Sequence, residues 1–589
     1  AGQRAEPGGD GVVAEAGVVD DAQLVHGDAT GGPPPRRDVR MEGGALIDAS
    51  AGEVSIVAMD RPADAALVSS DPFKQIGRVS ASARVHIADG ARINVAGLEN
   101  VRVSAARNSV EVELRGAQLQ DSAYQRDGIL RNATVVVDIR ETGVREDGTE
   151  WVGTPLADLR ADIAAVGKTV GERSVQGGSV SIASQGDALI EQGSTIDVSG
   201  GAIQYLDDGM TTTKLVSDGR VYDIANAPED LRYDRLLTTF TKDFTKWGVR
   251  RVWNLFPNRN ESGYVRGFDA GSFHLVAARG ALEGTLRGGV VIGPKQRERM
   301  PRGGEFVFGL PPNEQIRQDF DLRSPDITFS PLKRLNALLA TGFNVYGDAL
   351  PAAFDSFFID PELFDEQGMH RGRIYSNGRI LLPEDVNLIM PAGGSLALTA
   401  GQLDLQGGIV IPAGNISLET RDTLTLSAEL TRIDVGARSR LDTRGTWTND
   451  TPILSSVLGP IHRNGGSVSL IGNGGAGVFL AGGSVIDVSG GGWLDADGNL
   501  RAGNAGSIDL RAIGTGEYGI VPPRLVVNGT LAGYALGSGG SLRMDAPEIC
   551  IGGGACAGTT GLRIDPARFQ QGGFNRFALN ANQGGLTVA

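Results

Sequence analysis

The sequence is poor in cysteine, in basic charge and in long apolar runs. Only two of its 589 residues are cysteine, and 55 basic against 70 acidic residues leave a net charge of −15. An acidic chain does not offer the basic surface that nucleic acids or anionic membranes bind. No apolar run approaches the roughly 18 residues of a membrane-spanning helix. Glycine is common, at 86 residues, but it does not occupy every third position, which excludes collagen.

The two ends of the sequence resemble interior parts of a chain. The opening residues, AGQRAEPGGD, lack an initiator methionine, a basic region and an apolar stretch. We therefore expect that any export signal has been removed or lies upstream. The final residues, GGLTVA, have the pattern of a strand interior, so we expect this to be a fragment of a longer polypeptide.

A short pattern of glycine, a small polar residue and then alternating apolar residues occurs seven times. The copies at Gly394 and Gly414 are 20 residues apart, and those at Gly466 and Gly506 are 40 apart. A fixed period with one short strand per repeat is typical of a solenoid, in which stacked neighbours bury a shared core. The pattern predicts an all-β parallel β-helix of about 20 residues per coil, with roughly 20 coils in a rod on the order of 100 Å long. The copies begin at Gly178, Gly271, Gly394, Gly414, Gly466, Gly506 and Gly540.

A second repeat lies between copies of the first and contains an aspartate or asparagine after an apolar residue, as in GSTIDVSGG and GSVIDVSGG. Such side chains satisfy turn amides where a coil bends, so we predict a structural role for them. The apolar residues beside them should form inward ladders. The predicted turn residues are Asp48, Asn94, Asp197, Asp442 and Asp487, and the predicted ladder residues are Val180, Ile182, Ile196, Val468, Leu470, Ile486 and Val488.

Cys550 and Cys556 enclose the short loop CIGGGAC, whose three glycines would let the thiols meet. A local disulfide formed in an oxidising compartment is the favoured interpretation, followed by two free thiols. Metal binding is the least favoured, because no histidine or further cysteine lies nearby to complete a site. The motif DADGN at Asp495 resembles a calcium loop with a misplaced glycine, and we predict a hairpin turn there instead.

Composition divides the chain into four regions. Residues 1–42 are a Gly/Pro-rich linker or irregular segment, and residues 43–205 are a β-helix shaft with an irregular insertion near 117–175. Residues 206–375 are shaft coils interrupted by aromatic-rich insertions, and residues 376–589 are a regular shaft that continues beyond the fragment. Insertions on a solenoid often form its binding face. Alternatively, the aromatic residues simply pack the insertions against the shaft.

Three helices are predicted within these irregular regions. One covers 154–167, with Thr154 as its cap and Gly167 at its end. Another starts near Pro228 and continues through Trp247, because leucine and aromatic residues recur at spacings of three and four. The third runs from a cap at Ser330 to Gly342.

Several longer phrases are similar to those of the filamentous haemagglutinin-like exoproteins, the secreted partners of bacterial two-partner secretion systems. They are GSTIDVSGG, GSVIDVSGG, VEVELRGAQLQDSAYQRDGILRNATVVVDIR, WVGTPLADL and FQQGGFNRFALNANQGGLTV. The resemblance covers residues 43–589 and implies a right-handed β-helical fibre, exported through an outer-membrane β-barrel transporter and acting in adhesion or biofilm formation. The family's amino-terminal NPNL and NPNGI phrases are missing, so the resemblance implies shaft and transfers no functional residue.

These observations together favour a non-enzymatic fibre, secreted or held at the cell surface of a Gram-negative bacterium, with a host-surface glycan or protein, neighbouring cells or other fibres as contact partners. No catalytic, cofactor-binding or metal-binding residue can be assigned, and the binding residues are unknown. One alternative is the stalk of a contact-dependent growth-inhibition toxin, and another is a carbohydrate-active β-helix, either a lyase or a hydrolase. The five histidines show no metal-ligand spacing: His26, His86, His274, His370 and His462.

Overall fold

The computed structural model describes residues 12–14, 37–58, 83–145, 148–237, 239–254, 259–309, 325–421, 427, 429–451, 459–514, 522–553, 556 and 560–588. The chain divides into two compact units. The first, which we call the shaft, comprises residues 1–99, 174–201 and 267–589, and the second unit comprises residues 100–173 and 202–266.

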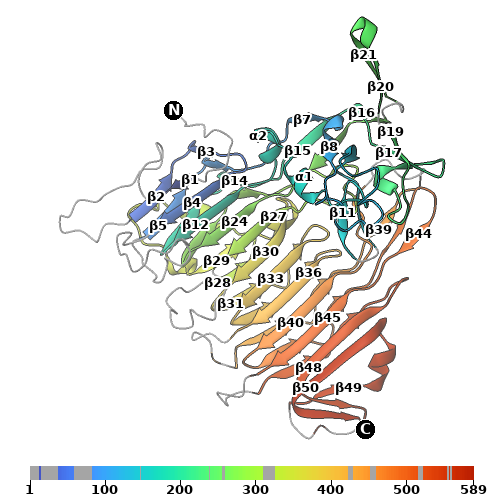
Figure 1. Cartoon of the computed structure of the whole chain (residues 1–589). Coiled ribbons are helices and arrows are strands. Elements are labelled where there is room, and N and C mark those ends of the chain that lie inside the picture. The colour runs from blue at the N-terminus through green and yellow to red at the C-terminus, as the bar shows by residue number, and fades with distance from the viewer. Residues whose placement is uncertain are drawn as a thin grey trace. The chain divides into compact units, whose positions relative to one another are not determined.

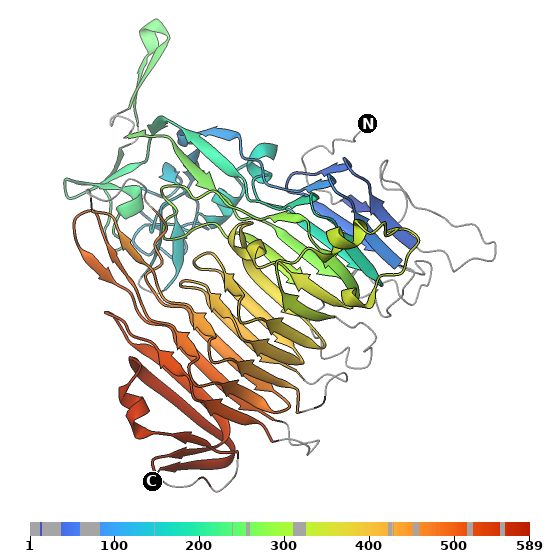
Figure 2. The ribbon, with the colours of Figure 1, turned by 180° about the vertical axis from the view of Figure 1, so that it is seen from behind.

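The shaft is an all-β parallel β-helix, which confirms the predicted fold class. Its largest sheet, the first sheet, has thirteen strands, and successive strands pair in parallel from the blue to the red end of the chain in Figure 1. Figure 2 shows the same rows from behind. The strands of the first sheet are β1 (Val12–Ala14), β4 (Glu53–Ala58), β12 (Ser179–Ser184), β24 (Ser272–Val276), β27 (Gly304–Phe308), β30 (Met369–Tyr375), β33 (Ser395–Ala400), β36 (Asn415–Thr420), β40 (Ser467–Asn473), β45 (Ser507–Ile513), β48 (Gly540–Ile551), β49 (Leu562–Ile564) and β50 (Phe574–Val588).

Two further faces complete each coil. The second face consists of β2 (Arg37–Met41), β5 (Ala83–Ile87), β13 (Asp187–Ile190) and β25 (Arg279–Leu282), and then of β29 (Ser356–Ile359), β28 (Asp326–Phe329), β31 (Arg379–Leu382), β34 (Gln402–Leu405), β37 (Arg432–Val435), β41 (Gly477–Leu480) and β46 (Arg524–Val527). The third face consists of β3 (Leu46–Asp48), β6 (Arg92–Asn94), β14 (Thr195–Asp197) and β26 (Thr285–Arg287), and then of β32 (Asn387–Ile389), β35 (Gly408–Val410), β38 (Arg440–Asp442), β42 (Val485–Asp487) and β47 (Thr530–Ala532).

The coil length varies more than the sequence repeat predicts. Leu396 pairs with Ile416, 20 residues further on, whereas Val468 pairs with Ile508 after 40 residues and Val54 with Val180 after 126. Loops and insertions between the strands therefore account for much of the chain length. The first sheet has twelve rows, because β49 pairs with the same edge of β48 as β45 does, so at the usual strand spacing the described shaft is about 50 Å long rather than 100 Å.

The predicted inward ladders are present. Val180, Ile182, Ile196, Val468, Leu470, Ile486 and Val488 are all buried. All except Val488, which follows β42, stack in register on neighbouring strands, as when Val468 lies between Ile416 and Ile508. The sequence repeat therefore reflects one continuous apolar core.

The first glycine of the repeat is required by close stacking of the coils. A Cβ atom built on Gly506 would lie 1.6 Å from the carbonyl oxygen of Gly466, and one on Gly466 would lie 1.7 Å from that of Gly414. Gly271 and Gly178 are related in the same way, at 1.6 Å. Because no side chain fits this spacing, the repeat tolerates only glycine here.

Four of the five predicted turn residues, all except Asp48, accept turn amides as expected. The side-chain oxygen of Asp197 accepts a hydrogen bond from the amide of Ser199, and Asn94, Asp442 and Asp487 each bind the amide two residues ahead in the same way. Asn94 additionally donates to Asp48 in the next coil. These are Asx turns that end the third-face strands.

One row of the second face departs from chain order. β28 pairs with both β29 and β31, and β29 contacts β25. Along the stack of coils, β29 therefore lies between β25 and β28, although it follows β28 in the sequence. Helix α4 (Glu362–Asp365) follows and contacts β32 and β30. Phe329 and Phe357 lie in this row and are fully buried.

Residues 330–355 form an insertion that covers the outer side of the second face; we call it the cover. It contains helix α3 (Arg334–Leu339) and the 3₁₀ helix Ala352–Phe354. Ser330 binds only the amide of Leu332, so the predicted helix begins later than expected. The carboxylate of Glu283, in the shaft, accepts instead from the amides of Leu335 and Asn336.

A buried ion pair lies beneath the cover. Arg84 donates to the carboxylate of Asp187 at 2.6 and 3.1 Å, and Arg279 donates to the other carboxylate oxygen at 3.1 Å. Arg84 and Asp187 side chains are each 1% exposed. Arg84 also reaches the carbonyl oxygens of Val345 and Asp348 in the cover. This charge network therefore joins the cover to the shaft.

The second unit is built from short, mostly antiparallel pairs with an apolar core of its own. The core includes Leu114, Val135, Leu159, Leu215 and Ile224. Its elements are β7 (Val101–Ser104), β15 (Ala202–Leu206), β23 (Tyr264–Gly267), β8 (Ser109–Glu113), β9 (Thr134–Asp138), β10 (Thr142–Val144), β11 (Glu150–Val152), β16 (Asp208–Met210), β22 (Arg259–Glu261), β17 (Lys214–Ser217), β18 (Arg220–Asp223), β19 (Arg235–Leu237), β20 (Thr239–Phe244), β21 (Val249–Asn254), α1 (Arg160–Ala164), α2 (Val170–Arg173), and the 3₁₀ helices Ala105–Asn108, Ile224–Asn226 and Thr245–Trp247.

The helix predicted from Pro228 to Trp247 is wrong. β19, β20 and the 3₁₀ helix Thr245–Trp247 lie in this stretch, and β20 forms with β21 an antiparallel hairpin that projects from the other strands of the unit in Figure 1. Threonine and valine favour strands, and the spacing of the aromatic residues fits a strand, a turn and a second strand equally well. Trp247, near the tip, is 73% exposed.

Two other boundaries are corrected. The helix expected at 154–167 is limited to α1, because the Thr154 hydroxyl accepts from the amide of Leu156 to form a turn before it. The irregular segment 1–42 contains β1 and β2, which pair with β4 and β5 of the shaft.

The hairpin predicted at Asp495 is confirmed: β43 (Gly492–Leu494) pairs with β44 (Leu500–Ala502), beside β39 (Trp447–Asn449). The short 3₁₀ helix Pro566–Gln570 precedes β50.

Candidate binding groove

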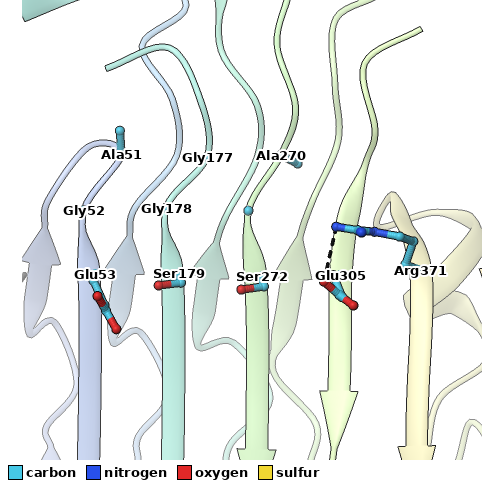
Figure 3. Close-up of a pocket in the computed structure, with 11 residues that line it drawn as sticks. Ala51, Gly52, Glu53, Gly177, Gly178, Ser179, Ala270, Ser272, Glu305 and Arg371 are labelled. Atoms are coloured by element: carbon cyan, nitrogen blue, oxygen red, sulfur yellow. Dashed lines mark ion pairs between the residues drawn. The ribbon is translucent and has the colours of Figure 1, made fainter. Parts of the chain in front are cut away.

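A polar groove of about 430 Å³ lies at the start of the strands of the first sheet. Glu53, Ser179, Ser272 and Glu305 stand in one row across four adjacent strands, since they are register partners. Figure 3 shows this row, with Arg371 turned towards Glu305 from the fifth strand. The groove therefore runs across the strands, along the direction in which the coils stack.

The floor of the groove is backbone. Gly52, Gly178 and Gly271 line it, preceded by Ala51, Gly177 and Ala270. Stacking of the coils excludes larger residues at Gly178 and Gly271, as described above. The same glycines that allow tight stacking thus leave an open floor without side chains.

The two ends of the row differ in how their carboxylates are used. Glu305 binds Arg371 at 3.2 Å and Arg373 at 2.6 Å. The carboxylate of Glu53 and the hydroxyls of Ser179 and Ser272 make no side-chain hydrogen bond to another residue in the described part of the chain. These three groups are therefore available to a ligand with donors and acceptors of its own.

The carboxylates of the groove are too far apart for glycoside hydrolysis of the usual kind. Glu53 and Glu305 are separated by three strand steps, or roughly 14 Å at the usual spacing. Retaining enzymes hold their two carboxyl groups about 5 Å apart, and inverting enzymes hold them at most about 10 Å apart. The row therefore suits binding better than paired acid and base catalysis.

A smaller polar cavity of about 170 Å³ lies within the second unit. Arg140, at its wall, binds Asp138 at 2.6 Å and Glu261 at 3.0 Å and the hydroxyl of Tyr264 at 3.1 Å. The hydrogen bond to Asp138 raises the pKa of Arg140, against the opposing effect of burial. Lys214 pairs with Asp223 on the opposite wall. The charged groups of this cavity thus largely neutralise one another.

Most of the aromatic residues predicted either to bind or to pack are packed in the interior. Phe273, Phe306, Phe308, Phe357 and Phe364 are fully buried in the shaft, and ring pairs such as Phe273 and Phe306 lie 6.0 Å apart. In the second unit, Tyr205 stacks on Tyr264 at 4.7 Å. Packing therefore accounts for most of the aromatic enrichment, and Trp247 is a clear exposed exception among the described residues of 206–375.

Cys550 and Cys556 form a disulfide, with their Cα atoms 5.6 Å apart. Sequence reasoning missed the neighbour of this pair, Glu548. One carboxylate oxygen of Glu548 and the two sulfur atoms lie within 4.8 Å of one another. The spacing Glu-x-Cys on a strand was the available signal, because residues two apart share a face.

The histidines occupy separate structural positions. His86 binds Glu191 at 2.7 Å and Tyr346 at 3.2 Å, and His274 binds the carbonyl of Gly309 at 2.9 Å. His370 accepts from the amide of Gly303 at 2.9 Å. Burial lowers the pKa of His370 and of His462, and the charges of His462 and Arg371 lower that of His370 further. His26 lies outside the described residues.

Comparison with known proteins identifies no relative. No family model matches the chain, and no curated protein and no solved structure matches it. Among the described residues, no helix is both long and apolar enough to cross a bilayer. The class defined on structural grounds is that of a parallel β-helix protein with a separate second unit.

Proposed function

We propose that the chain is the structural shaft of a large bacterial fibre that is exported by two-partner secretion and acts in adhesion or biofilm formation. The observation that carries the proposal is the first sheet, whose strands stack in parallel over twelve rows. A solenoid of this kind holds a contact element away from its point of attachment without needing a catalytic centre. The family resemblance in the sequence supports the same function and an outer-membrane transporter as partner.

The hairpin β20–β21 is the contact element that the structure favours. It carries Trp247 in an exposed position, and exposed aromatic residues contribute strongly to protein contacts. The rest of the second unit is a poorer target for deletion, because Leu215, Ile224 and Tyr233 belong to its core. Removing only Thr239–Asn254 therefore tests the contact while leaving the core residues of the second unit in place.

Location and adhesion are tested in the organism that makes the protein. An antibody raised against the purified chain should label intact cells, and deletion of the gene should reduce attachment to surfaces or biofilm mass. A chromosomal deletion of residues 239–254 should reduce attachment while surface labelling persists. Labelling that appears only after cell lysis would contradict the proposal, and normal attachment of the hairpin deletion would place the contact elsewhere.

The carbohydrate-active alternative is favoured by one observation, the open polar groove with the unengaged Glu53. It is examined by incubating the purified chain with acidic and neutral polysaccharides. Release of unsaturated or reducing ends would replace the fibre proposal with an enzymatic one. The toxin-stalk alternative shares the shaft and is decided by the sequence that follows residue 589.

A further inference from the structure

The environment of the Cys550–Cys556 disulfide contains a third group that can bind a metal ion. Glu548 and Cys550 lie two residues apart on β48, so their side chains share one face of the strand. Both residues are buried, and Cys556 is partly exposed. The three candidate ligand atoms lie within 4.8 Å of one another.

The spacing is close to that of a tetrahedral zinc site. With zinc–sulfur bonds of about 2.3 Å and zinc–oxygen bonds of about 2.1 Å, two ligand atoms on one ion lie roughly 3.5 to 3.8 Å apart. Once the bond between the sulfur atoms is broken, they need only separate to that distance. Two thiolates and a carboxylate leave the fourth position for water.

One side of the site is fixed by strand pairing. Residues Ile549, Cys550 and Ile551 pair with β49 on one side and with β50 on the other, so Glu548 and Cys550 are held by a strand with partners on both edges. In the sequence CIGGGAC, Cys556 follows a run of three glycines, the residue type that restricts the backbone least.

We propose that reduction of this disulfide creates a site for a thiophilic divalent cation such as Zn²⁺, bound by the sulfur atoms of Cys550 and Cys556 and by the carboxylate of Glu548. A phosphine reductant transfers two electrons to the disulfide and is oxidised to the phosphine oxide with oxygen from water, and the two protons of that water complete the thiols. The metal then displaces the two thiol protons, which are released to solvent. Disulfide and metal are therefore mutually exclusive states of one site. This inference does not depend on the proposed function.

The test uses Co²⁺ as a spectroscopic probe on the full chain. The protein is reduced with a phosphine, freed of excess reductant under anaerobic conditions and titrated with Co²⁺. We expect one equivalent to bind with a thiolate-to-cobalt charge-transfer band and tetrahedral visible bands, and Zn²⁺ to abolish both. The oxidised protein should show neither. The absence of these bands in the reduced protein, or equal bands in the oxidised protein, would overturn the proposal.

Two variants test whether the carboxylate of Glu548 binds the ion and whether the ion needs the space beside Gly561. Glu548→Gln should weaken Co²⁺ binding by roughly tenfold or more, whereas the matched acidic control Glu53→Gln should leave it unchanged. In Gly561→Ala the new Cβ would lie 2.6 Å from the sulfur of Cys556 and should block the ion. Circular dichroism of the oxidised variants confirms that they are folded. Equal affinity of Glu548→Gln and the parent would remove the carboxylate from the site and overturn the assignment.

Discussion

The cover and the second unit are both departures from the β-helix coil, but they bury their apolar residues differently. The cover packs Leu335, Val345 and Leu350 against Leu189 and Ala281 of the shaft, so its apolar cluster is shared with the coil. The second unit builds its core from its own residues, which come from two separate stretches of chain. A short insertion therefore depends on the coil for its core, whereas a long one supplies its own.

The polar contacts follow the same division. The cover is held by charges that the shaft provides, namely the Arg84–Asp187 pair and the carboxylate of Glu283 at the start of α3. The second unit keeps its ion pairs internal, as with Arg140, Asp138 and Glu261. Disrupting shaft residues should therefore release the cover, and disrupting core residues of the second unit should act within that unit.

The largest effect is expected from Asp187→Ala. It leaves the guanidinium of Arg84 buried without its carboxylate, and removal of one partner of a buried ion pair costs about 3–5 kcal/mol. Denaturant unfolding should show the loss, and amides of residues 334–354 should lose protection from hydrogen exchange. Asp243→Ala removes half of an exposed pair with Arg250 and should leave both measurements unchanged. Unchanged protection of the cover in Asp187→Ala would contradict the role of this pair.

The next effect is expected from Leu159→Ala, which opens a cavity in the core of the second unit. A fully buried leucine replaced by alanine costs about 2–5 kcal/mol. Hydrogen exchange should speed up in β8 and β9, which line the same core. Val170→Ala, at an exposed site in α2, serves as the control and should behave as the parent. If exchange in β8 and β9 is equal in the two variants, the second unit does not depend on this core.

A smaller loss is expected from Gly506→Ala in the regular part of the shaft. The added methyl group would collide with the carbonyl of Gly466, and such overpacking costs about 1–3 kcal/mol. Gly482→Ala is the matched control, because its Cβ has no neighbour within 4 Å. Thermal unfolding should show a lower midpoint for the first variant only. Equal midpoints would mean that the coils can separate at this point without loss.

The smallest effect concerns pH. The pKa of His370 is lowered in the folded protein by burial, by His462 and by Arg371, from an ordinary value of 6.5. The unfolded chain therefore takes up the proton first, so the stabilising contribution is present above pH 6.5 and is lost as the pH falls below it. The loss of stability between pH 8 and pH 5.5 should be smaller in His370→Gln than in the parent. Identical pH profiles would show that His370 does not contribute.

The regular shaft could be predicted from sequence because its period reflects a local requirement repeated at each coil. Gly466 and Gly506 are needed for close stacking, Asp487 for a turn, and Ile486 for the ladder, and each can be recognised within a few residues. The disulfide was the favoured interpretation for the same reason, since only six residues separate Cys550 from Cys556.

The features that the sequence did not predict depend on distant residues. Glu283 lies about 50 residues before the helix that it caps, and Asp187 is 103 residues from Arg84. Neither pairing leaves a local pattern. The hairpin β20–β21 was mistaken for a helix because a spacing of three and four residues also arises when two strands are joined by a turn. For the groove, the decisive fact is the register that aligns Glu53 with Ser179 across 126 residues.

The reversed order of β28 and β29 has a consequence for folding of the shaft. Elsewhere among the described strands of the three faces, each new row lies beyond the rows that precede it in the sequence. A new strand can therefore pair with a row that has already formed. β28 cannot do so, because its neighbour on that side, β29, is about 30 residues further along the chain. We therefore expect this row to be completed only after the chain has returned to place β29, and to form more slowly than the regular rows.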